Sequence, residues 1–491
     1  MNHVLRRLLC FCAPLGAIGL LAALHGTALG ESTDRVNVMW LIAEDLSPDL
    51  SCYGVEEVAT PNLDRLAADG MRFTHMFTTS GVCSPSRTAL AVGCMQTSVG
   101  AFHMRYTNPI RPALPDGVQT IAELMQDAGY TSANIAMRGE HPEGKGKDDW
   151  MFQRRERSQW QLKAWEELKQ HQPFYSQINF RLTHRPWERD PNRPIDPATV
   201  KLPPYYPDTQ VVREDWAAYL ESLQVLDSQV GRVLALLEAD GLDKNTVVFF
   251  MGDHGRPFTR AKYWCYDSGL RVPFLVRWPD GMAKPRGYEA GAVSDQLLSS
   301  IDLTATTLAL SGTARPDWME GRIFLGDHQD APREAVFAAA DRIGELEFQT
   351  RSIRTRRFRY VRNELHGFSI NEASTAHRKG NHPLYHVLRR CDAEGRLNAA
   401  QRTVVDPLPP EQLFDIDADP FEIRNLAEDP AHADTLAELR RQLDAWIEVS
   451  GDQGRLPDSP EVIAAFEEYG RQSRKRYAAG YEQLKKRAEA E

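Results

Sequence analysis

The chain has 491 residues, of which 42% are hydrophobic and 26% are charged. This ordinary globular composition can supply a sizeable core, and the length predicts about two to four domains, or one large domain with a smaller companion. The formal net charge of −10 argues against a nucleic-acid-binding protein, and an acidic protein that acts on an anionic substrate needs a locally basic pocket.

The N-terminal segment, residues 1–30, is predicted to be a secretory signal peptide. An arginine pair forms a short basic region, residues 8–24 are almost continuously apolar, and Ala28 and Gly30 supply the small residues of a cleavage site. We therefore expect export to a periplasmic, secreted or lysosomal-type compartment, without stable membrane association after cleavage. An uncleaved membrane anchor and a twin-arginine signal are the alternatives.

Two of the seven cysteines lie within this signal peptide, so five remain in the mature chain. An odd number of cysteines in an exported protein leaves at least one thiol unpaired or chemically special. No spacing among them resembles a zinc site. Disulfide pairing stays open for the five, which are Cys52, Cys83, Cys94, Cys265 and Cys391.

Strand-like and helix-like segments alternate through residues 31–335. The apolar run 37–43 ends in Glu44 and Asp45, and the apolar run 245–251 ends just before Asp253 and His254. Acidic residues at the carboxyl ends of buried strands mark the edge where open α/β sheets place their sites. The alternation predicts an α/β domain with a large, mostly parallel sheet and helices on both faces. Further predicted elements are a strand at 272–278, a strand-like segment at 174–182 and helices at 60–70, 118–129 and 216–237.

The pattern changes beyond about residue 335. Short strand-like segments are followed by a helical pattern at 431–449, which predicts a smaller C-terminal α+β domain over residues 336–450. Residues 451–491 are highly charged and are predicted to form a helical tail. The short strands are expected at 337–340, 349–354 and 357–362.

Arginines are concentrated in the last two of these strands. One interpretation is a solvated edge strand, and the other is that some of the arginines, with His366, line a pocket for an acidic sugar. The arginines are Arg351, Arg354, Arg356, Arg357, Arg359 and Arg362, with Arg342 shortly before them.

Cys83 begins the motif that decides the functional interpretation. Cys83, Pro85 and Arg87 form Cys-x-Pro-x-Arg, followed by a segment of small residues with helical character. This motif resembles the signature of the formylglycine-dependent sulfatase family, whose members share an alkaline-phosphatase-like fold. The resemblance implies that a formylglycine-generating enzyme oxidises Cys83 to formylglycine during maturation.

The chemistry of sulfate esters explains why such a motif is needed. A sulfate ester is negatively charged and repels nucleophiles, so its site needs cations and a strong oxygen nucleophile. A hydrated aldehyde offers two hydroxyls: one attacks sulfur, and the other, once deprotonated, expels sulfate and restores the aldehyde. The N-terminus of the helix after Cys83 helps to hold the anion, and Arg87 is expected to fix the charge of the nucleophile.

The resemblance also implies a divalent cation. The family carries carboxylates after its first strand and an Asp with Asn or His after a later one, and here Glu44-Asp45 and Asp253-His254 occupy these places. Together with the oxygen formed at Cys83, these residues are expected to hold one Ca²⁺ or Mg²⁺ ion, because hard cations prefer oxygen donors. Glu44 departs from the usual Asp, and His254 is the least typical ligand.

Three further residues match positions that the family uses for the substrate. Lys262, in Lys-x-x-x-x-Asp-Ser-Gly-Leu-Arg-Val-Pro, is expected to contact the sulfate and the leaving oxygen. His184, in Thr-His-Arg-Pro, is expected to protonate the leaving group or to bind sulfate. His103 lies where relatives place a histidine that assists release of sulfate.

A second lysine does not occupy its usual place. After the place of Gly129-Tyr130, most sulfatases have a strand that ends in Gly-Lys-x-His, and here that place reads Ala136-Met137-Arg138-Gly139, without a lysine. Lys147 follows about ten residues later, as in sulfamidase-like members, so it is expected to bind sulfate. Arg138 is the alternative for the lysine, and His141 for the missing histidine.

The combined pattern is identified as a hydrolase of sulfate esters or sulfamates, nearest to the N-sulfoglucosamine sulfohydrolase branch of the family. A sulfated carbohydrate is therefore the expected substrate, by analogy with that branch. Two alternatives stay open: a phosphomonoester, phosphodiester or phosphonate hydrolase of the same superfold, and a non-catalytic binding homologue. The oligomeric state is left open.

Overall fold

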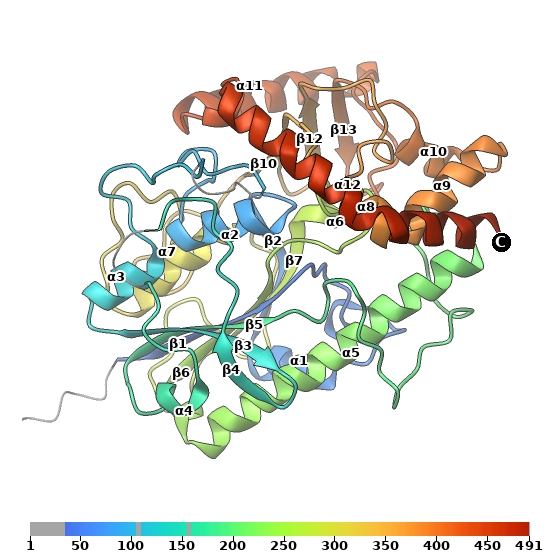
Figure 1. Ribbon diagram of the computed structural model, residues 1–491. Helices are drawn as coiled ribbons and strands as arrows, with labels where there is room; N and C mark the ends of the chain where they lie inside the picture. Colours follow the sequence, from blue (N-terminus) through green and yellow to red (C-terminus); the bar gives the residue numbers. More distant parts are fainter. Residues whose placement is uncertain (1–34, 105–109, 155–158, 491) are drawn as a thin grey trace, which may run out of the picture. The chain divides into compact units, whose positions relative to one another are not determined.

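The computed structural model of the chain describes residues 35–104, 110–154 and 159–490 (Figure 1). The predicted signal peptide lies outside the described residues. Within the described ranges, no helix combines the length and the apolar composition that a membrane crossing requires.

The main sheet is built around β1 (Asn37–Ala43), whose residues are all buried. β1 lies between β5 (Phe174–Phe180) and β6 (Thr246–Gly252) and runs parallel to both. The other strands are β2 (Met71–Phe77), β3 (Thr131–Arg138), β4 (His141–Lys145), β7 (Arg271–Arg277), β8 (Val293–Ser294) and β9 (Leu298–Ser299). Their order across the described residues is β4-β3-β5-β1-β6-β7-β2-β8, with β9 paired to β2.

Most pairings in this sheet are parallel, which confirms the predicted α/β fold. β3 also runs parallel to β5, whereas the β3–β4, β6–β7 and β2–β7 pairs are antiparallel. The sequence analysis did not predict β2, whose alternation of apolar and polar residues, the pattern of a half-buried strand, is broken by the consecutive polar residues Thr74 and His75.

Helices cover both faces of the main sheet (Figure 1). Met39 and Leu41 of β1 belong to one core and Trp40 and Ile42 to another, so β1 must be apolar on both sides. The first core includes α1 (Pro61–Asp69) and α5 (Gln210–Ala239), and the second includes α3 (Ile121–Asp127), α7 (Ser300–Leu310) and part of α2 (Cys83–Val92).

The register around β1 determines which residues leave the sheet together. Ala43 pairs with Phe180 on one side and Gly252 on the other. The amide of Glu44 donates to the Phe180 carbonyl at 3.0 Å, and the amide of Asp253 donates to the Ala43 carbonyl at 2.9 Å. The acidic pairs that follow β1 and β6 therefore emerge side by side at the carboxyl edge of the sheet.

A second, antiparallel sheet follows in the C-terminal region, as predicted. Its strands, in spatial order, are β10 (Val336–Ala340), β11 (Thr350–Arg354), β12 (Phe358–Asn363) and β13 (Glu411–Asp415). α11 packs on this sheet, and α12 packs on α8 and α9. The helices of this region are α8 (Ala376–Asn381), α9 (Pro383–Ala393), α10 (Ala399–Val405), α11 (Ala433–Val449) and α12 (Pro460–Glu489). Short helices elsewhere are α4 (Trp165–Leu168), α6 (Asp267–Leu270) and 3-10 turns at Ser51–Tyr53, Leu242–Lys244, Pro430–His432 and Gln453–Arg455.

The arginines of β11 and β12 are held by carboxylates. Arg351 is 2% exposed and lies 3.0 Å from a carboxylate oxygen of Asp341. Arg354 and Arg359 both contact Asp267, and both are buried. The interpretation as a solvated edge strand is wrong, because β11 and β12 are the inner strands of this sheet. These three guanidinium groups already have carboxylate partners within the protein.

Asp341 is predicted to make the stability of the folded chain depend on pH. Burial, with Asp452 nearby, raises the pKa of Asp341 to about 7 against the opposing effect of Arg351. An unfolded chain releases this proton near pH 4, so between about pH 4 and about pH 7 the folded chain alone retains it, and stability falls as the pH rises. Asp341→Asn is therefore expected to gain about 2–4 kcal/mol relative to the natural chain between pH 4 and pH 8.

Thermal unfolding at pH 5 and at pH 8 measures this difference. The exposed Asp417→Asn variant is the control, and its melting temperature should follow that of the natural chain at both pH values. An Asp341→Asn variant whose offset from the natural chain is the same at both pH values would contradict the assignment.

Candidate functional site

The carboxyl ends of β1, β5 and β6 and the start of α2 bring the predicted site residues together. Asp45 follows β1 and has a φ of 51°, a left-handed conformation that is uncommon for a non-glycine residue and is concentrated at functional sites. Its amide donates to Asp253 Oδ1 at 2.9 Å. His184 follows β5, and Cys83 is the first residue of α2.

Cys83 lies at the centre of this cluster and is fully buried. Its Sγ atom lies 3.2 Å from His254 Nε2, 3.6 Å from Asp45 Oδ1 and 3.7 Å from Lys262 Nζ. Residues that are up to 217 positions apart in sequence thus surround one thiol. The helix start beneath Cys83 adds the positive end of the α2 dipole.

Arg87 lies one turn further along α2 and connects the cluster to two strands. Its Nε donates to Asp253 Oδ2 at 2.8 Å, and its Nη1 donates to Asn179 Oδ1 at 2.7 Å. Nη2 of Arg87 is buried and has no hydrogen-bond partner among the described residues. The sequence analysis missed Asn179, and its strand gives no clear signal for it, because Ser176 and Gln177 are also polar.

Lys147 reaches the same cluster from the segment after β4. Its Nζ lies 2.9 Å from Glu44 Oε2, 3.7 Å from Asp149 Oδ2 and 4.0 Å from Asp253 Oδ2. Arg138 and His141, the alternatives for the residues missing from the usual motif, are both exposed. The geometry therefore favours Lys147, which approaches the carboxylates despite its late position in the sequence.

Lys262 and His184 face a cavity of about 380 Å³. Lys262 Nζ donates to both carboxylate oxygens of Asp45, at 2.9 and 2.7 Å. His184 Nδ1 lies 2.8 Å from the Arg185 carbonyl, which can only accept, so Nδ1 carries the proton and Nε2 is the acceptor. Burial, with Lys262 nearby, lowers the pKa of His184 and favours this neutral form.

His103 contacts other residues. Its Nε2 lies 2.6 Å from Asp458 Oδ1, and its Nδ1 accepts from the Arg342 amide at 3.2 Å. Burial lowers the pKa of His103, although Asp458 opposes this effect. Because both ring nitrogens are engaged, His103 would have to exchange a partner in order to act on a substrate. Its catalytic role stays a prediction.

The carboxylates of Glu44, Asp45 and Asp253 fit the donor set of a hard divalent cation. All three are buried, and ligand atoms of Glu44, Asp45 and His184 lie within 4.8 Å of one another, as do those of Asp45, Cys83 and His254. Oxygen donors gathered at one point are what Ca²⁺ and Mg²⁺ require.

The protonation of His254 supports this fit. Burial alone would lower the pKa of His254, but Asp253, Cys83 and Asp45 outweigh burial and raise it to about 10. For Asp253, burial would raise the pKa, but His254, Arg87 and Lys147 hold it below its ordinary value. The buried carboxylates thus favour the protonated, positively charged forms of the neighbouring side chains. A bound cation would supply the same positive charge.

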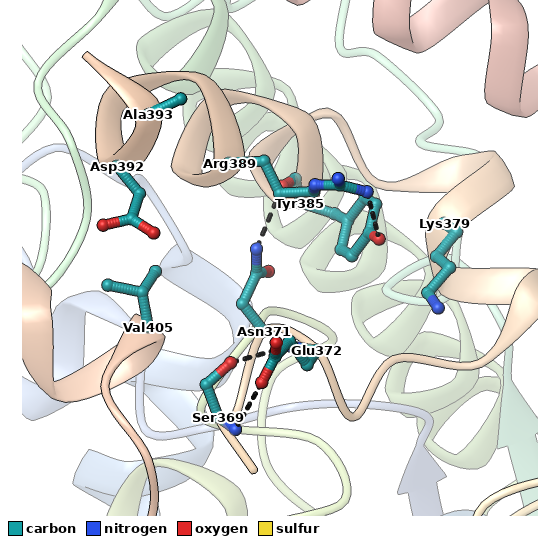
Figure 2. A pocket seen from close by; sticks show the side chains of 9 residues that line it. All are labelled: Ser369, Asn371, Glu372, Lys379, Tyr385, Arg389, Asp392, Ala393 and Val405. Carbon is teal, nitrogen blue, oxygen red and sulfur yellow. Dashed lines mark hydrogen bonds between the residues drawn. The ribbon is translucent and has the colours of Figure 1, made fainter.

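A second cavity, of about 460 Å³, lies beside α9 and α10 (Figure 2). Among the described residues that line it there is none of the predicted site residues. Figure 2 shows its polar groups bonded to one another: Arg389 to the Tyr385 hydroxyl, Asn371 to the Tyr385 carbonyl, and Ser369 with Glu372. The contacts within this cavity are consistent with a structural role.

The five cysteines in the described part of the chain are free thiols. Burial raises the pKa of Cys94 and of Cys265 to about 12, so neither is a reactive thiolate. Cys83 differs from them by its neighbours, since cationic and carboxylate groups surround it.

Comparison with known proteins agrees with this geometry. The family model described as Sulfatase matches residues 36–313. An ulvan-active sulfatase of Formosa agariphila is 33% identical over 484 residues, which cover 87% of this chain and 77% of that protein. The human N-sulphoglucosamine sulphohydrolase is 26% identical over 459 residues, which cover 84% of this chain and 89% of that protein.

The same fold also occurs in an enzyme with a different named activity. The phosphonate monoester hydrolase of Silicibacter pomeroyi aligns with a TM-score of 0.62 and 19% identity, covering 86% of this chain and 96% of that chain. Identity this low shows the fold alone. The choice of chemistry therefore depends on the side chains around Cys83.

Proposed function

Since the chain belongs to the sulfatase family of sulfuric ester hydrolases, we propose that it cleaves sulfate groups from a sulfated carbohydrate with a formylglycine formed from Cys83. The observation that carries this proposal is the position of the Cys83 thiol, within 3.7 Å of His254, Asp45 and Lys262. Cys265 differs from Cys83, because its side chain packs in an apolar cluster with Phe77 and Leu270.

Glu44, Asp45 and Asp253, with the oxygen at position 83 and with His254 once it has lost its proton, would hold one divalent cation, and Ca²⁺ is the ion we propose. When bound, the cation supplies positive charge that polarises the nucleophile and the sulfate oxygens. Carboxylates without a rigid octahedral arrangement suit Ca²⁺ better than Mg²⁺. Lys262 and Lys147, which contact Asp45 and Glu44, would then turn their ammonium groups to the sulfate oxygens.

The remaining roles follow from where each side chain lies. Once Cys83 is converted and hydrated, its hydroxyls supply the oxygen nucleophile. Arg87 holds Asp253 in place and presents its unpartnered Nη2 to the same centre. His184 lines the cavity and is proposed to protonate the departing atom, a step for which Nε2 must first take up a proton, because the neutral ring carries its proton on Nδ1.

The wider expectations belong to the same proposal. The chain is exported by the signal at residues 1–30 and is modified by a formylglycine-generating enzyme. Residues 31–335 carry the chemistry, and residues 336–450 and 451–491 form the second domain and the tail. The carbohydrate substrate is supported by the relatives, since one is named for ulvan and the other for sulphoglucosamine.

The mass of the peptide that contains Cys83 tests the proposal directly. Conversion of Cys to formylglycine lowers the mass by about 18 Da, and this shift is expected in protein produced with the modifying enzyme. The peptide that contains Cys265 is the internal control and should keep its thiol mass. An unmodified Cys83 in enzyme that is fully active would refute the proposed nucleophile.

Turnover of matched aryl esters separates the proposal from the phosphonate hydrolase alternative. The converted protein is expected to hydrolyse an aryl sulfate with a higher kcat/KM than the corresponding aryl phosphate or phosphonate. A preference for the phosphorus esters would favour the alternative, and turnover of none of them would favour a non-catalytic binding protein.

A further inference from the structure

The cavity that contains His184 and Lys262 extends to the C-terminal helix. The cavity is lined by the segment after β5 and by residues of α8 and α12. Tyr469, Ser473, Arg476 and Tyr477 are the α12 residues that line it. A helix of the C-terminal tail therefore forms part of the wall that a substrate would contact.

Two arginines in this cavity have no partner among the described residues. Arg181 and Arg476 both line it, both are exposed, and neither forms an ion pair or hydrogen bond with any described residue. Other cations of the same cavity are neutralised: Arg185 Nη1 lies 2.6 Å from Asp215, and Lys262 Nζ lies 2.7 Å from Asp45. Arg181 and Arg476 are thus available to an anion from outside the protein.

One carboxylate also lines the cavity. Glu345 Oε1 accepts from the Ala376 amide at 2.6 Å, which holds it at the start of α8, and its Oε2 has no hydrogen-bond partner among the described residues. A single carboxylate leaves the cavity with a surplus of positive charge, because two arginines remain unneutralised. Such a surplus attracts an anionic ligand.

Close packing fixes the backbone of α12 next to Arg476. A Cβ atom on Gly480 would lie 2.3 Å from the Gly380 carbonyl oxygen, and one on Gly380 would lie 2.7 Å from the Cβ of Tyr477. α12 therefore rests directly on α8 at these glycines (Figure 1). The Tyr477 ring packs edge-on against His377 at 5.0 Å, and His377 lies 6.2 Å from the ring of His184.

We propose that Arg181 and Arg476 form a subsite for a second anionic group of the substrate, either a carboxylate or a second sulfate. The subsite shares one cavity with His184 and Lys262, so the second anion lies on the same molecule as the sulfate that is cleaved. This inference rests on the proposed function. Guanidinium groups bind both carboxylate and sulfate oxygens through paired hydrogen bonds, so the two sources share one chemistry.

The test compares Arg181→Gln and Arg476→Gln with Lys475→Gln in the converted enzyme. Lys475 is an exposed neighbour on α12 that does not line the cavity. The first pair of substrates is a sulfated disaccharide with a hexuronate carboxylate and the same disaccharide with that carboxyl reduced to an alcohol. The second pair is a disulfated and a monosulfated monosaccharide. The sulfate ester of an uncharged aryl alcohol is the substrate without a second anion or a sugar.

Each arginine variant is expected to raise KM about 10-fold for substrates with a second anion and to leave KM unchanged for those without one. An effect confined to the disaccharide pair identifies a carboxylate, and an effect confined to the monosaccharide pair identifies a second sulfate. Equal changes on all substrates, no change, or the same change in Lys475→Gln would overturn the subsite. Failure of the proposed function is distinguishable, because the natural enzyme would then leave the aryl sulfate intact.

Discussion

Replacing Cys83 with alanine is expected to reduce sulfate-ester turnover by about 10⁴-fold or more. The substitution removes the thiol group whose oxidation and loss yield the formylglycine aldehyde, while Lys262, His254 and Asp45 stay around this position. Because the thiol is small and buried, the free energy of unfolding should change by no more than about 1 kcal/mol. Initial rates with an aryl sulfate and a urea unfolding curve give the two quantities.

Cys265→Ala is the matched control for this experiment. Cys265 is as deeply buried as Cys83 but lies in an apolar cluster with Phe77 and Leu270. Its replacement should leave turnover intact and cost a similarly small amount of stability. If Cys83→Ala keeps more than a tenth of the natural activity, the nucleophile lies elsewhere.

Asp253→Asn is expected to abolish cation binding, to lower turnover strongly, and to destabilise the fold by about 3 kcal/mol. Asp253 is fully buried and lies 2.8 Å from Arg87 Nε, so losing its charge leaves a buried guanidinium without its nearest counter-ion. Turnover should fall by about 10³-fold, because a proposed ligand and the anchor of Arg87 are lost together. Elemental analysis of the dialysed protein measures bound calcium, and urea unfolding measures stability.

Two further variants separate these effects. Adding Arg87→Met to Asp253→Asn removes the unpaired charge and should restore most of the stability but no activity. Asp452→Asn breaks the buried pair with Arg351 in the second sheet, so it should reduce stability while calcium and turnover are retained. An Asp253→Asn protein that still binds stoichiometric calcium would remove Asp253 from the ligand set.

Local sequence patterns predicted the elements that carry the chemistry. The apolar run at 37–43 coincides with β1, and the run at 245–251 differs from β6 by a single residue at each end. These predictions succeeded because a strand buried on both faces is apolar throughout. The long helix was predicted at 216–237 but begins at Gln210, since Arg213, Glu214 and Asp215 interrupt the apolar pattern of its first turns, although Asp215 is buried.

Residues that act through distant contacts could not be predicted in the same way. The arginines of β11 and β12 suggested exposure or a sugar pocket, yet Arg351 and Arg359 are buried against Asp452 and Asp267. The partners lie 101 and 92 positions away, and no local pattern encodes such pairing. The part of the cavity wall that α12 forms could not be predicted either. It depends on Gly380 and Gly480, which allow α8 and α12 to pack closely.

The groups around Cys83 and the proposed substrate-binding Arg476 come from different parts of the fold, and this separation has an evolutionary consequence. The groups around Cys83 come from strand ends and α2, whereas Arg476 comes from a helix that ends near the last residue of the chain. Changes in α12 can therefore alter which saccharides are accepted while the bond-breaking machinery stays untouched. Substitutions in α12 alone can therefore change the substrate specificity of such an enzyme during evolution, without any change at the reactive centre.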